Sequence, residues 1–356
     1  MNTWGNRIKL TVFGTSHGAA VGVALDGLRA GLKLDMVLVE KDLLRRAPRA
    51  DGMSTPRQES DRYELLSGVY NGFTDGTPIV ALFRNTDARA DDYAQARLAR
   101  PSHADYAAHV KYGGFADLRG GGMFSGRMTL PLVFAGAVAR QYLAEKGVFV
   151  GAHVLQIGGI LDERFDPVSV DETCLNALDP FFPLLDPSRR ALMEHALLNA
   201  RKEGDSLGAM AECAAVGLKT GTGEPFFSSL ESSIASLLFS VPGVKAVEFG
   251  AGASFAAMKG SEANDGFCVE NGCIKTTTNH SGGINGGMAN GMPLVVRAAF
   301  RPIPTIAREQ QSIDLNTRTP GTLCSKGRHD ACILPRGLAA VEATVCLALL
   351  DAYGGM

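Results

Sequence analysis

The fold is organised around residues 100–145, RPSHADYAAHVKYGGFADLRGGGMFSGRMTLPLVFAGAVARQYLAE, where chemically versatile side chains and a glycine turn run directly into an apolar segment. From Leu130 onward nearly every residue is Leu, Val, Phe or Ala, and Arg140 with Gln141 forms the first strongly polar interruption. Apolar residues on several helical faces predict a helix that is buried over most of its circumference. The stretch therefore predicts a site followed by a rigid helical scaffold.

The glycine turn consists of Gly120, Gly121 and Gly122, and it is flanked by Arg119 and Arg127. Glycine lacks a Cβ atom, so the backbone can turn sharply or approach a ligand closely, and guanidinium groups bind phosphate well. Two interpretations follow from these residues alone. The turn is either a phosphate site or only a loop that precedes a core helix.

The composition is that of an ordinary globular protein. With 356 residues, of which 46% are apolar and 20% charged, the chain can bury a substantial core as one large domain or two. The net charge of -2 lacks the excess of Lys and Arg that nucleic acid or an anionic membrane requires, so neither is expected as a partner. Eleven arginines nevertheless lie between positions 45 and 127, which favours a local anion site.

The cysteine pattern argues against both a disulfide framework and a zinc site, because the seven cysteines include no C-x-x-C pair. We therefore expect a reducing cytoplasm and no metal. The first residues, MNTWGNRIKL, lack the pattern of a signal peptide, and no run of about 18 apolar residues occurs. No membrane segment is expected.

The N-terminal part predicts two strands and a helix. Polar and apolar residues alternate over residues 7–13, the period of a half-buried strand, and GTSHG follows at 14–18. His17 thus lies in a glycine-flanked turn, where a side chain can reach a ligand, although a lone histidine in a loop is more often merely solvated. A second strand is predicted at 21–25, and Asp35 caps a helix that extends to about Arg45.

The same order of strand, glycine turn and helix recurs at 213–239. There CAAVGLK is typical of a strand and TGTGEP of a turn, and Ser228 with Glu231 forms a capping box before apolar residues at helical spacing. This recurrence predicts an internal duplication. An amphipathic helix at 184–203, an apolar strand at 292–300 and a helix from Leu338 to about Leu349 complete the predicted elements.

Two polar segments are candidates for ligand binding. Residues 45–62, RRAPRADGMSTPRQESDR, are either a solvated loop or a loop of arginines that folds over a phosphorylated substrate. Residues 279–291, NHSGGINGGMANG, are rich in glycine and imply backbone close to a planar or phosphate-bearing ligand. Two such loops suggest a large ligand.

The motifs together resemble the chorismate synthase family. They are GTSHG (14–18), STPRQESD (54–61), LSGVYNG (66–72), DGTPI (75–79), RPSHADY (100–106), the glycine turn with Ser125 and Arg127, GDSLG (204–208), GSEAND (260–265), TTTNHSGGINGGMANGMP (276–293), RPIPTI (301–306), SID (312–314) and GRHDACILPR (327–336). They fall in the order and at the spacing of that family over essentially the whole chain. A dozen ordered motifs are far more specific than any one of them.

The resemblance implies an α+β fold, a sandwich with central helices between antiparallel sheets, in which residues 1–356 form a single domain. It implies a homotetramer in the cytoplasm with a small-molecule substrate. It also implies the last common step of the shikimate pathway of aromatic amino acid biosynthesis, the 1,4-trans elimination of phosphate from 5-enolpyruvylshikimate 3-phosphate to give chorismate. The cofactor would be reduced FMN, with NADPH as a possible reductant.

The resemblance also assigns roles to individual residues. The catalytic residues would be His17, His103 and Asp330. The residues that bind the substrate and its phosphate would be Ser16, Arg46, Arg57, Arg100, Arg127 and Arg328. The residues that bind the cofactor would be Ser125, Pro242, Gly243, Gly286, Arg301, Pro302, Ile303, Pro304, Thr305 and Arg328, and no metal would be bound.

The chain departs from the family's usual pattern at several site positions. They are Thr15 in place of Glu, Met123 in a run where the family has Arg-Ser-Ser-Ala-Arg-Glu-Thr, Phe124 in the same run, Gly52 in place of Arg, Arg301 in place of Lys and Ala331 in place of Pro. The departures leave an alternative open. It is a divergent, weakly active or inactive member that binds a flavin or a phosphorylated ligand.

Overall fold

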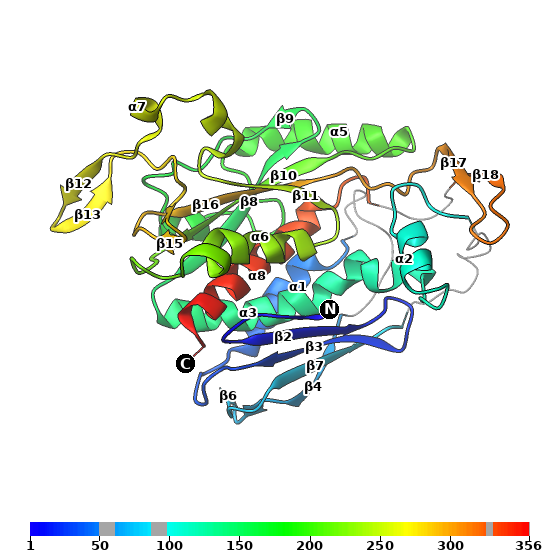
Figure 1. Ribbon diagram of the computed structural model, residues 1–356, viewed down its shortest axis with the longest axis horizontal. Coiled ribbons are helices and arrows are strands. Elements are labelled where there is room, and N and C mark those ends of the chain that lie inside the picture. The colour runs from blue at the N-terminus through cyan, green and yellow to red at the C-terminus, as the bar shows by residue number, and fades with distance from the viewer. Residues whose placement is uncertain (50–60, 87–97, 325–329, 356) are drawn as a thin grey trace.

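The computed structural model describes residues 1–49, 61–86, 98–324 and 330–355, and it consists of two antiparallel sheets with helices between them (Figure 1). The first sheet has the order β1 (Thr3–Trp4), β2 (Lys9–Gly14), β3 (Ala20–Asp26), β7 (Ile79–Arg84), β4 (Tyr63–Ser67). The second has the order β11 (Val244–Phe249), β16 (Leu294–Phe300), β10 (Ala209–Val216), β8 (Phe149–Ile157), β9 (Ile160–Leu161). The predicted α+β sandwich is confirmed.

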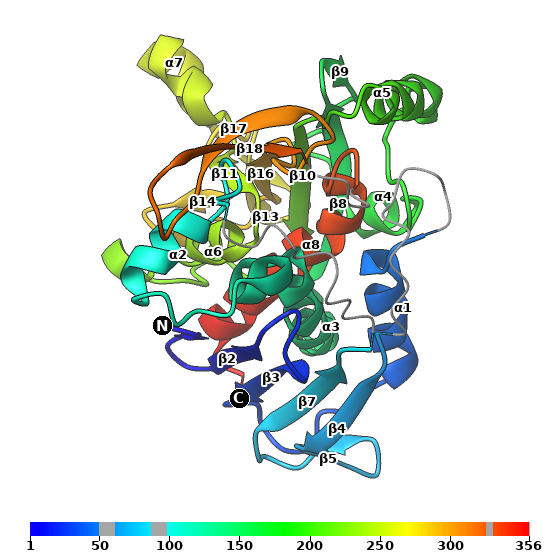
Figure 2. The ribbon, with the colours of Figure 1, turned by 90° about the vertical axis from the view of Figure 1, so that its right-hand side faces the viewer.

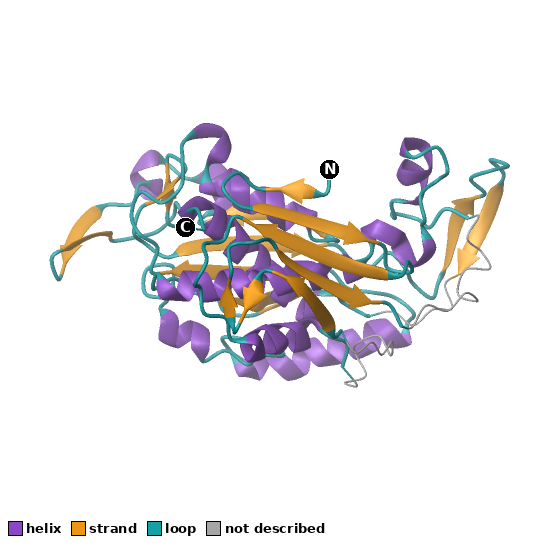
Figure 3. Cartoon of the chain, turned by 90° about the horizontal axis from the view of Figure 1, so that it is seen from below, coloured by secondary structure: helices purple, strands orange, loops and turns teal. Residues whose placement is uncertain are grey.

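Helices fill the space between the sheets, and Figures 2 and 3 show the molecule from two further sides. They are α1 (Met36–Arg46), α3 (Thr129–Glu145), α6 (Leu230–Ser240) and α8 (Leu334–Tyr353). The remaining elements lie around this body: α2 (Asp105–Lys111), α4 (Glu172–Asn176), α5 (Arg190–Lys202), α7 (Gly260–Ala263), β5 (Val69–Tyr70), β6 (Phe73–Thr74), β12 (Phe267–Glu270), β13 (Cys273–Thr276), β14 (Ile284–Asn285), β15 (Met288–Ala289), β17 (Glu309–Ile313) and β18 (Pro320–Cys324).

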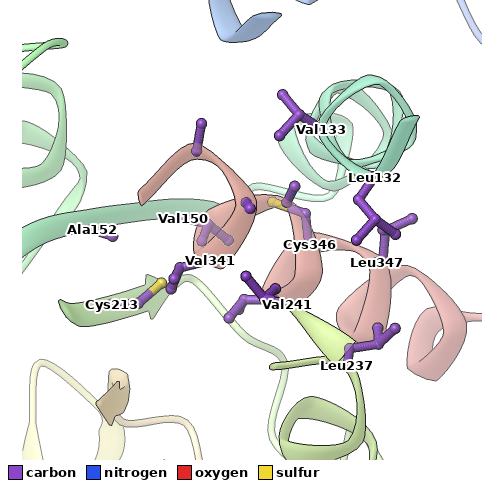
Figure 4. Packing of buried hydrophobic residues seen from close by; sticks show 14 of the residues in the cluster. Leu132, Val133, Val150, Ala152, Cys213, Leu237, Val241, Val341, Cys346 and Leu347 are labelled. Atoms are coloured by element: carbon purple, nitrogen blue, oxygen red, sulfur yellow. The ribbon is translucent and has the colours of Figure 1, made fainter. Parts of the chain in front are cut away.

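Helices α3 and α8 form the centre of the core. Every residue of α3 from position 129 to 139 is buried, as the apolar run after Leu130 predicts. The two helices approach so closely at Gly136 that a Cβ atom there would lie 2.3 Å from the Cβ atom of Ala343. Figure 4 shows side chains of both helices packed against those of β8, β10 and α6. One hydrophobic cluster therefore joins both sheets to the central helices.

The two halves repeat one topology. The order β2, β3, α1, β4, β7, α3 in the first half corresponds to β8, β10, α6, β11, β16, α8 in the second. The sheet orders β2-β3-β7-β4 and β8-β10-β16-β11 correspond strand for strand. The predicted internal duplication is therefore present at the level of topology.

Some predicted boundaries are wrong by a few residues. The cap of α6 is Ser229, whose side chain accepts a hydrogen bond from the Ser232 amide at 3.1 Å, and not Ser228. Helix α5 begins at Arg190, after a 3₁₀ turn at Pro187–Arg189. The arginine loop was predicted to be irregular from position 45, but Arg46 is the last residue of α1. The cause is that Asp35 caps a helix long enough to include both arginines.

The described residues show two further features. No helix within the described ranges is long and apolar enough to cross a membrane. The seven cysteines, all within those ranges, are free thiols, and Cys273 and Cys324 are exposed.

Candidate active site

The turn between β2 and β3 presents the first two predicted site residues. Ser16 is fully buried, and its hydroxyl lies 3.0 Å from the Gly120 carbonyl oxygen and 3.0 Å from Nδ1 of His17. The Ser16 amide donates to the Gly122 carbonyl oxygen at 3.2 Å. The turn is thus fixed against the glycine turn that precedes α3, although the two are about a hundred residues apart in sequence.

The glycine turn forms η2 (Arg119–Phe124), and its glycines all have positive φ. A Cβ atom on Gly120 would lie 1.9 Å from Cε1 of His17, and one on Gly122 would lie 2.0 Å from the Asp117 carbonyl oxygen. No side chain fits at such distances, so the absence of a Cβ atom at Gly120 creates the space for the imidazole. The turn is therefore part of the site and not only a connection to the core helix.

Two predicted phosphate ligands meet at a buried carboxylate. Asp61 accepts from Nη1 of Arg46 at 2.6 Å and from Nη1 of Arg127 at 3.0 Å. All three side chains are almost fully buried, and Asp61 has a φ of +47°, which is uncommon outside glycine. Arg46 also lies 3.3 Å from the hydroxyl of Thr129, the first residue of α3. Two cations thus share one anion, which leaves a positive balance among these three side chains.

Asp330 is connected to the backbone of Arg46 through Arg336. Its two carboxylate oxygens accept from Nη1 of Arg336 at 3.1 and 2.9 Å, and Nε of Arg336 donates to the Arg46 carbonyl oxygen at 3.0 Å. Arg336 belongs to the first turn of α8. This chain of contacts connects the predicted acid to the arginine cluster.

His103 belongs to a second group that connects α2 with the segment after β16. Its Nδ1 lies 3.0 Å from the Pro101 carbonyl oxygen, and its Nε2 lies 2.9 Å from the Thr305 hydroxyl. A carbonyl oxygen only accepts, so Nδ1 carries the proton and Nε2 accepts from Thr305. Arg301 donates to the Ser102 carbonyl oxygen, which holds the same two segments together.

Charge and burial set the protonation of this second group. Burial, and after it the nearby positive charge of Arg100, lowers the pKa of His103 to about 4. Burial alone would raise the pKa of Asp105, but two hydrogen bonds from Arg100 at 2.7 Å and its charge outweigh that effect and hold the pKa below its usual value. His103 is therefore neutral near pH 7, next to an intact ion pair.

Most of the other predicted cofactor residues lie around these two groups. The Ser125 hydroxyl accepts from the Arg127 amide at 3.3 Å, and the Gly243 carbonyl oxygen, which follows Pro242, accepts from the Arg301 amide at 2.9 Å. The segment 301–305 also contains Pro302, Ile303 and Pro304, and the Ile303 carbonyl oxygen accepts from the Ser206 hydroxyl at 2.7 Å. The turn after β2, helix α2 and the start of α3 lie at one end of the molecule, on the right in Figure 1.

Gly286 lies away from the other predicted cofactor residues within one copy of the chain. It lies between β14 and β15, and the Ala289 carbonyl oxygen of β15 accepts from the Gly221 amide. Lys219, two residues before Gly221, donates to the Tyr353 hydroxyl at the C-terminal end of α8. Asp330 precedes the other end of this 20-residue helix, which spans about 30 Å. Arg57 and Arg328 lie outside the described residues.

Sequence reasoning missed two residues of the site, Asn85 and Asp61. Asn85 accepts from Nε of Arg127 at 2.6 Å and donates to the Thr15 and Gly18 carbonyl oxygens at 2.9 and 2.8 Å. The available signal was its place directly after the apolar strand 79–84, because a polar residue at a strand end often reaches a site. Nothing in the sequence indicated which partners it would meet.

Met123 and Phe124, which depart from the family's pattern, present apolar surface beside the site. Their exposed fractions are 36% and 40%, and the Tyr112 hydroxyl lies 3.8 Å from the sulfur of Met123. Exposed apolar groups next to a Cβ-free turn can pack against a flat ligand. The residues present are therefore compatible with a flat cofactor such as a flavin.

Comparisons with known proteins agree on one family. A family model described as chorismate synthase matches residues 8–353. The chorismate synthases of Methanocella arvoryzae and Thermococcus gammatolerans are 44% and 43% identical to the chain, each over 98% of it and over 93% and 96% of their own lengths. A crystal structure of chorismate synthase superposes with a TM-score of 0.76 at 26% identity, over 98% of this chain and 92% of that one.

Proposed function

The chain belongs to the chorismate synthase family, and we propose that the groups around His17 and His103 form its active site. The activity is that of a chorismate synthase, a carbon–oxygen lyase that forms chorismate from 5-enolpyruvylshikimate 3-phosphate by 1,4-trans elimination of phosphate. High identity over nearly the whole chain gives no support to the divergent alternative. The observation that carries the proposed site is the contact of His17 with the glycine turn, beside two buried arginines on one carboxylate.

We assign the substrate phosphate to the first group. A leaving phosphate requires a positive environment and a proton. Arg46 and Arg127 supply the first requirement, and His17 within its turn supplies the second. Ser16 holds the imidazole through Nδ1, and Arg100 adds positive charge from the side of α2. Arg57 and Arg328 remain proposed from the family resemblance alone.

We assign removal of the substrate proton to Asp330. A base must present a carboxylate oxygen in a fixed direction, and Arg336 holds both oxygens of Asp330. Arg336 in turn is fixed by the Arg46 backbone, so acid, base and phosphate groups belong to one connected arrangement. This connection supports the assignment because elimination requires the proton and the phosphate to leave opposite ends of one small molecule.

The family is flavin-dependent, and we propose reduced FMN as the cofactor, with NADPH as its possible reductant. When bound, reduced flavin supplies electron density transiently to the allylic system of the substrate. Ser125, Gly243 and the segment 301–305 would hold it, and Arg301 is suited to its phosphate. His103 is neutral in the free protein, so a negative charge close to it would have to raise its pKa before it could donate a proton.

We also propose, from family membership, that residues 1–356 act as one domain, that the protein is a homotetramer and that it is cytoplasmic. The continuous hydrophobic cluster through both halves supports the single domain. Exposed free thiols at Cys273 and Cys324 support a reducing compartment.

Phosphate release from enolpyruvylshikimate phosphate, measured without oxygen and with chemically reduced FMN, tests the function. We expect turnover by the parent protein. His17→Ala and His103→Ala should each lower kcat by about 100-fold or more, the usual worth of a positioned proton donor. His195, an exposed histidine on α5, provides the matched control, and His195→Ala should leave kcat unchanged. Absence of phosphate release by the parent would refute the function, and a parent rate in either site variant would refute that residue's role.

A further inference from the structure

Asn85 connects the turn that carries His17 to Arg127. It directly follows β7, and the pairing of Ala20 with Arg84 places the end of β7 beside the start of β3. The side chain of a residue at this position can reach the turn between β2 and β3 from outside that hairpin. Asn85 is half-buried there, so its amide is shielded from part of the solvent.

The amide nitrogen of Asn85 closes the turn. Nδ2 donates to the carbonyl oxygens of Thr15 and Gly18 at 2.9 and 2.8 Å, which uses both of its hydrogens. The Gly18 amide donates to the same Thr15 oxygen at 3.1 Å, as in a β-turn. Both ends of the turn are thereby bound to one side chain, and the two residues between them are Ser16 and His17.

The amide oxygen of Asn85 fixes the arginine. Oδ1 accepts from Nε of Arg127 at 2.6 Å, while Nη1 of the same guanidinium donates to Asp61 and Nη2 lies 3.4 Å from the Arg84 carbonyl oxygen. A planar guanidinium held along two edges has a fixed orientation. One primary amide therefore sets the positions of the turn and of the cation relative to each other.

We propose that Asn85 is a positioning residue of the elimination reaction, which holds His17 and Arg127 in the mutual geometry that phosphate departure requires. The proposal rests on the proposed function. An amide neither gains nor loses a proton near neutral pH, so Asn85 acts through its two partners and not on the substrate. Misplacement of reacting groups by about 1 Å lowers rates by about 100-fold, which makes such a clamp consequential.

Gln141 of α3 offers a matched control. Its Nε2 donates to the carbonyl oxygens of Asp35 and Ala137 at 3.1 and 3.4 Å, and its Oε1 accepts from the Asp35 amide at 2.7 Å. It is a half-buried primary amide like Asn85, but these partners are not proposed site residues. A role in structural stability alone would make Asn85 and Gln141 equivalent.

Two substitutions separate the functions of the Asn85 amide. Asn85→Ala removes every bond, and we expect kcat to fall by about 100-fold and KM to rise about tenfold. Asn85→Asp keeps an oxygen that accepts from Arg127 but presents a second oxygen to the Thr15 and Gly18 carbonyl oxygens. We therefore expect kcat to fall as much as in Asn85→Ala, while KM changes less than about twofold. Gln141→Ala should lower the melting temperature and leave both constants unchanged.

A double variant tests whether Asn85 acts through His17. In a His17→Ala background, Asn85→Ala should lower kcat by no more than about twofold further, because the group that it positions is gone. Independent, multiplicative effects in the double variant would overturn the proposal. So would equal kinetic effects of Asn85→Ala and Gln141→Ala.

A ring-nitrogen NMR spectrum of the ¹⁵N-histidine-labelled protein keeps the proposal separable from the proposed function. If the parent releases no phosphate, the function fails, but the resonances of His17 still report on its position. Asn85→Ala should shift or broaden them, and Gln141→Ala should leave them in place. Unchanged His17 resonances in Asn85→Ala would overturn the positioning role whatever the enzyme's activity.

Discussion

Neighbouring arginines at the end of α1 enter two networks of similar design and different character. Arg45 binds Glu342 of α8, which also binds Arg140 of α3, while Arg46 binds Asp61, which also binds Arg127. In each network one buried carboxylate joins an arginine of α1 to an arginine on or just before α3.

The networks differ in what they hold. In the Glu342 network a second carboxylate, Asp42, lies 3.1 Å from both arginines, so two cations face two anions. Burial would raise the pKa of Glu342, but Arg45 and Arg140 outweigh it and hold the pKa at about 2. This balanced network holds the central helices together. In the Asp61 network Arg127 also donates to Asn85, which donates to both ends of the turn that carries His17, so this network reaches the proposed site.

The largest expected effect comes from breaking the balanced network. Glu342→Gln leaves Arg45 and Arg140 buried with one carboxylate fewer, and loss of one partner of a buried ion pair costs about 3–5 kcal/mol of unfolding free energy. Denaturant unfolding of parent and variant measures it. Phosphate release per folded molecule should stay within about twofold. A kinetic defect without a loss of stability would mean that the two networks are not distinct.

Arg127→Met is the complementary break, in the Asp61 network. Asp61 keeps Arg46 as a partner, so the unfolding free energy should change less than in Glu342→Gln. Charge-assisted hydrogen bonds to the substrate phosphate are worth about 1.5–3 kcal/mol, so KM should rise by about 10- to 100-fold. Steady-state phosphate release measures KM. Arg84→Met removes an equal charge from an exposed pair with Glu64 and should leave KM unchanged.

The sequence could predict the scaffold but not this distinction. The apolar run after Leu130 predicts α3, and the flanking glycines place His17 in a turn, because both signals are local. Which of Arg45 and Arg46 faces the site depends on their partners, Glu342 and Asp61. Glu342 lies far from Arg45 in the sequence, and Asp61 has a backbone conformation that is unrelated to that of α1. The bonds of Asn85 likewise depend on the register of β7 with β3. Family resemblance supplied roles for residues such as Asp330 that no local pattern could.

The apolar pair Met123 and Phe124, at the end of the glycine turn, gives a smaller effect. Met123→Arg with Phe124→Ser adds a cation and a hydroxyl next to the glycine turn, and we expect FMN to bind about tenfold more tightly, the equivalent of about 1.4 kcal/mol. Titration of flavin fluorescence measures the constant. Phe115→Ser, which replaces a nearly fully exposed aromatic residue on the preceding loop, is the control and should have no effect. Weaker binding in the double variant would mean that the pocket is built for an apolar contact.

The smallest effect concerns Arg100 and Asp105. This arginine–carboxylate pair lies beside His103 and belongs to neither of the two networks. Burial and the charge of Arg100 lower the pKa of His103 from 6.5 to about 4, so the unfolded chain binds a proton at a pH where the folded protein does not. The contribution of the neutral imidazole to stability is therefore complete above pH 6.5 and is lost as the pH falls toward 4. Partial exposure limits the change in unfolding free energy to about 1 kcal/mol between pH 6.5 and pH 5.

Denaturant unfolding across this pH range should show a shallower pH dependence in His103→Gln than in the parent, while His195→Gln on the surface of α5 should follow the parent. Equal slopes in all three proteins would mean that Arg100 and burial do not hold His103 neutral, and the site would then carry a further standing positive charge.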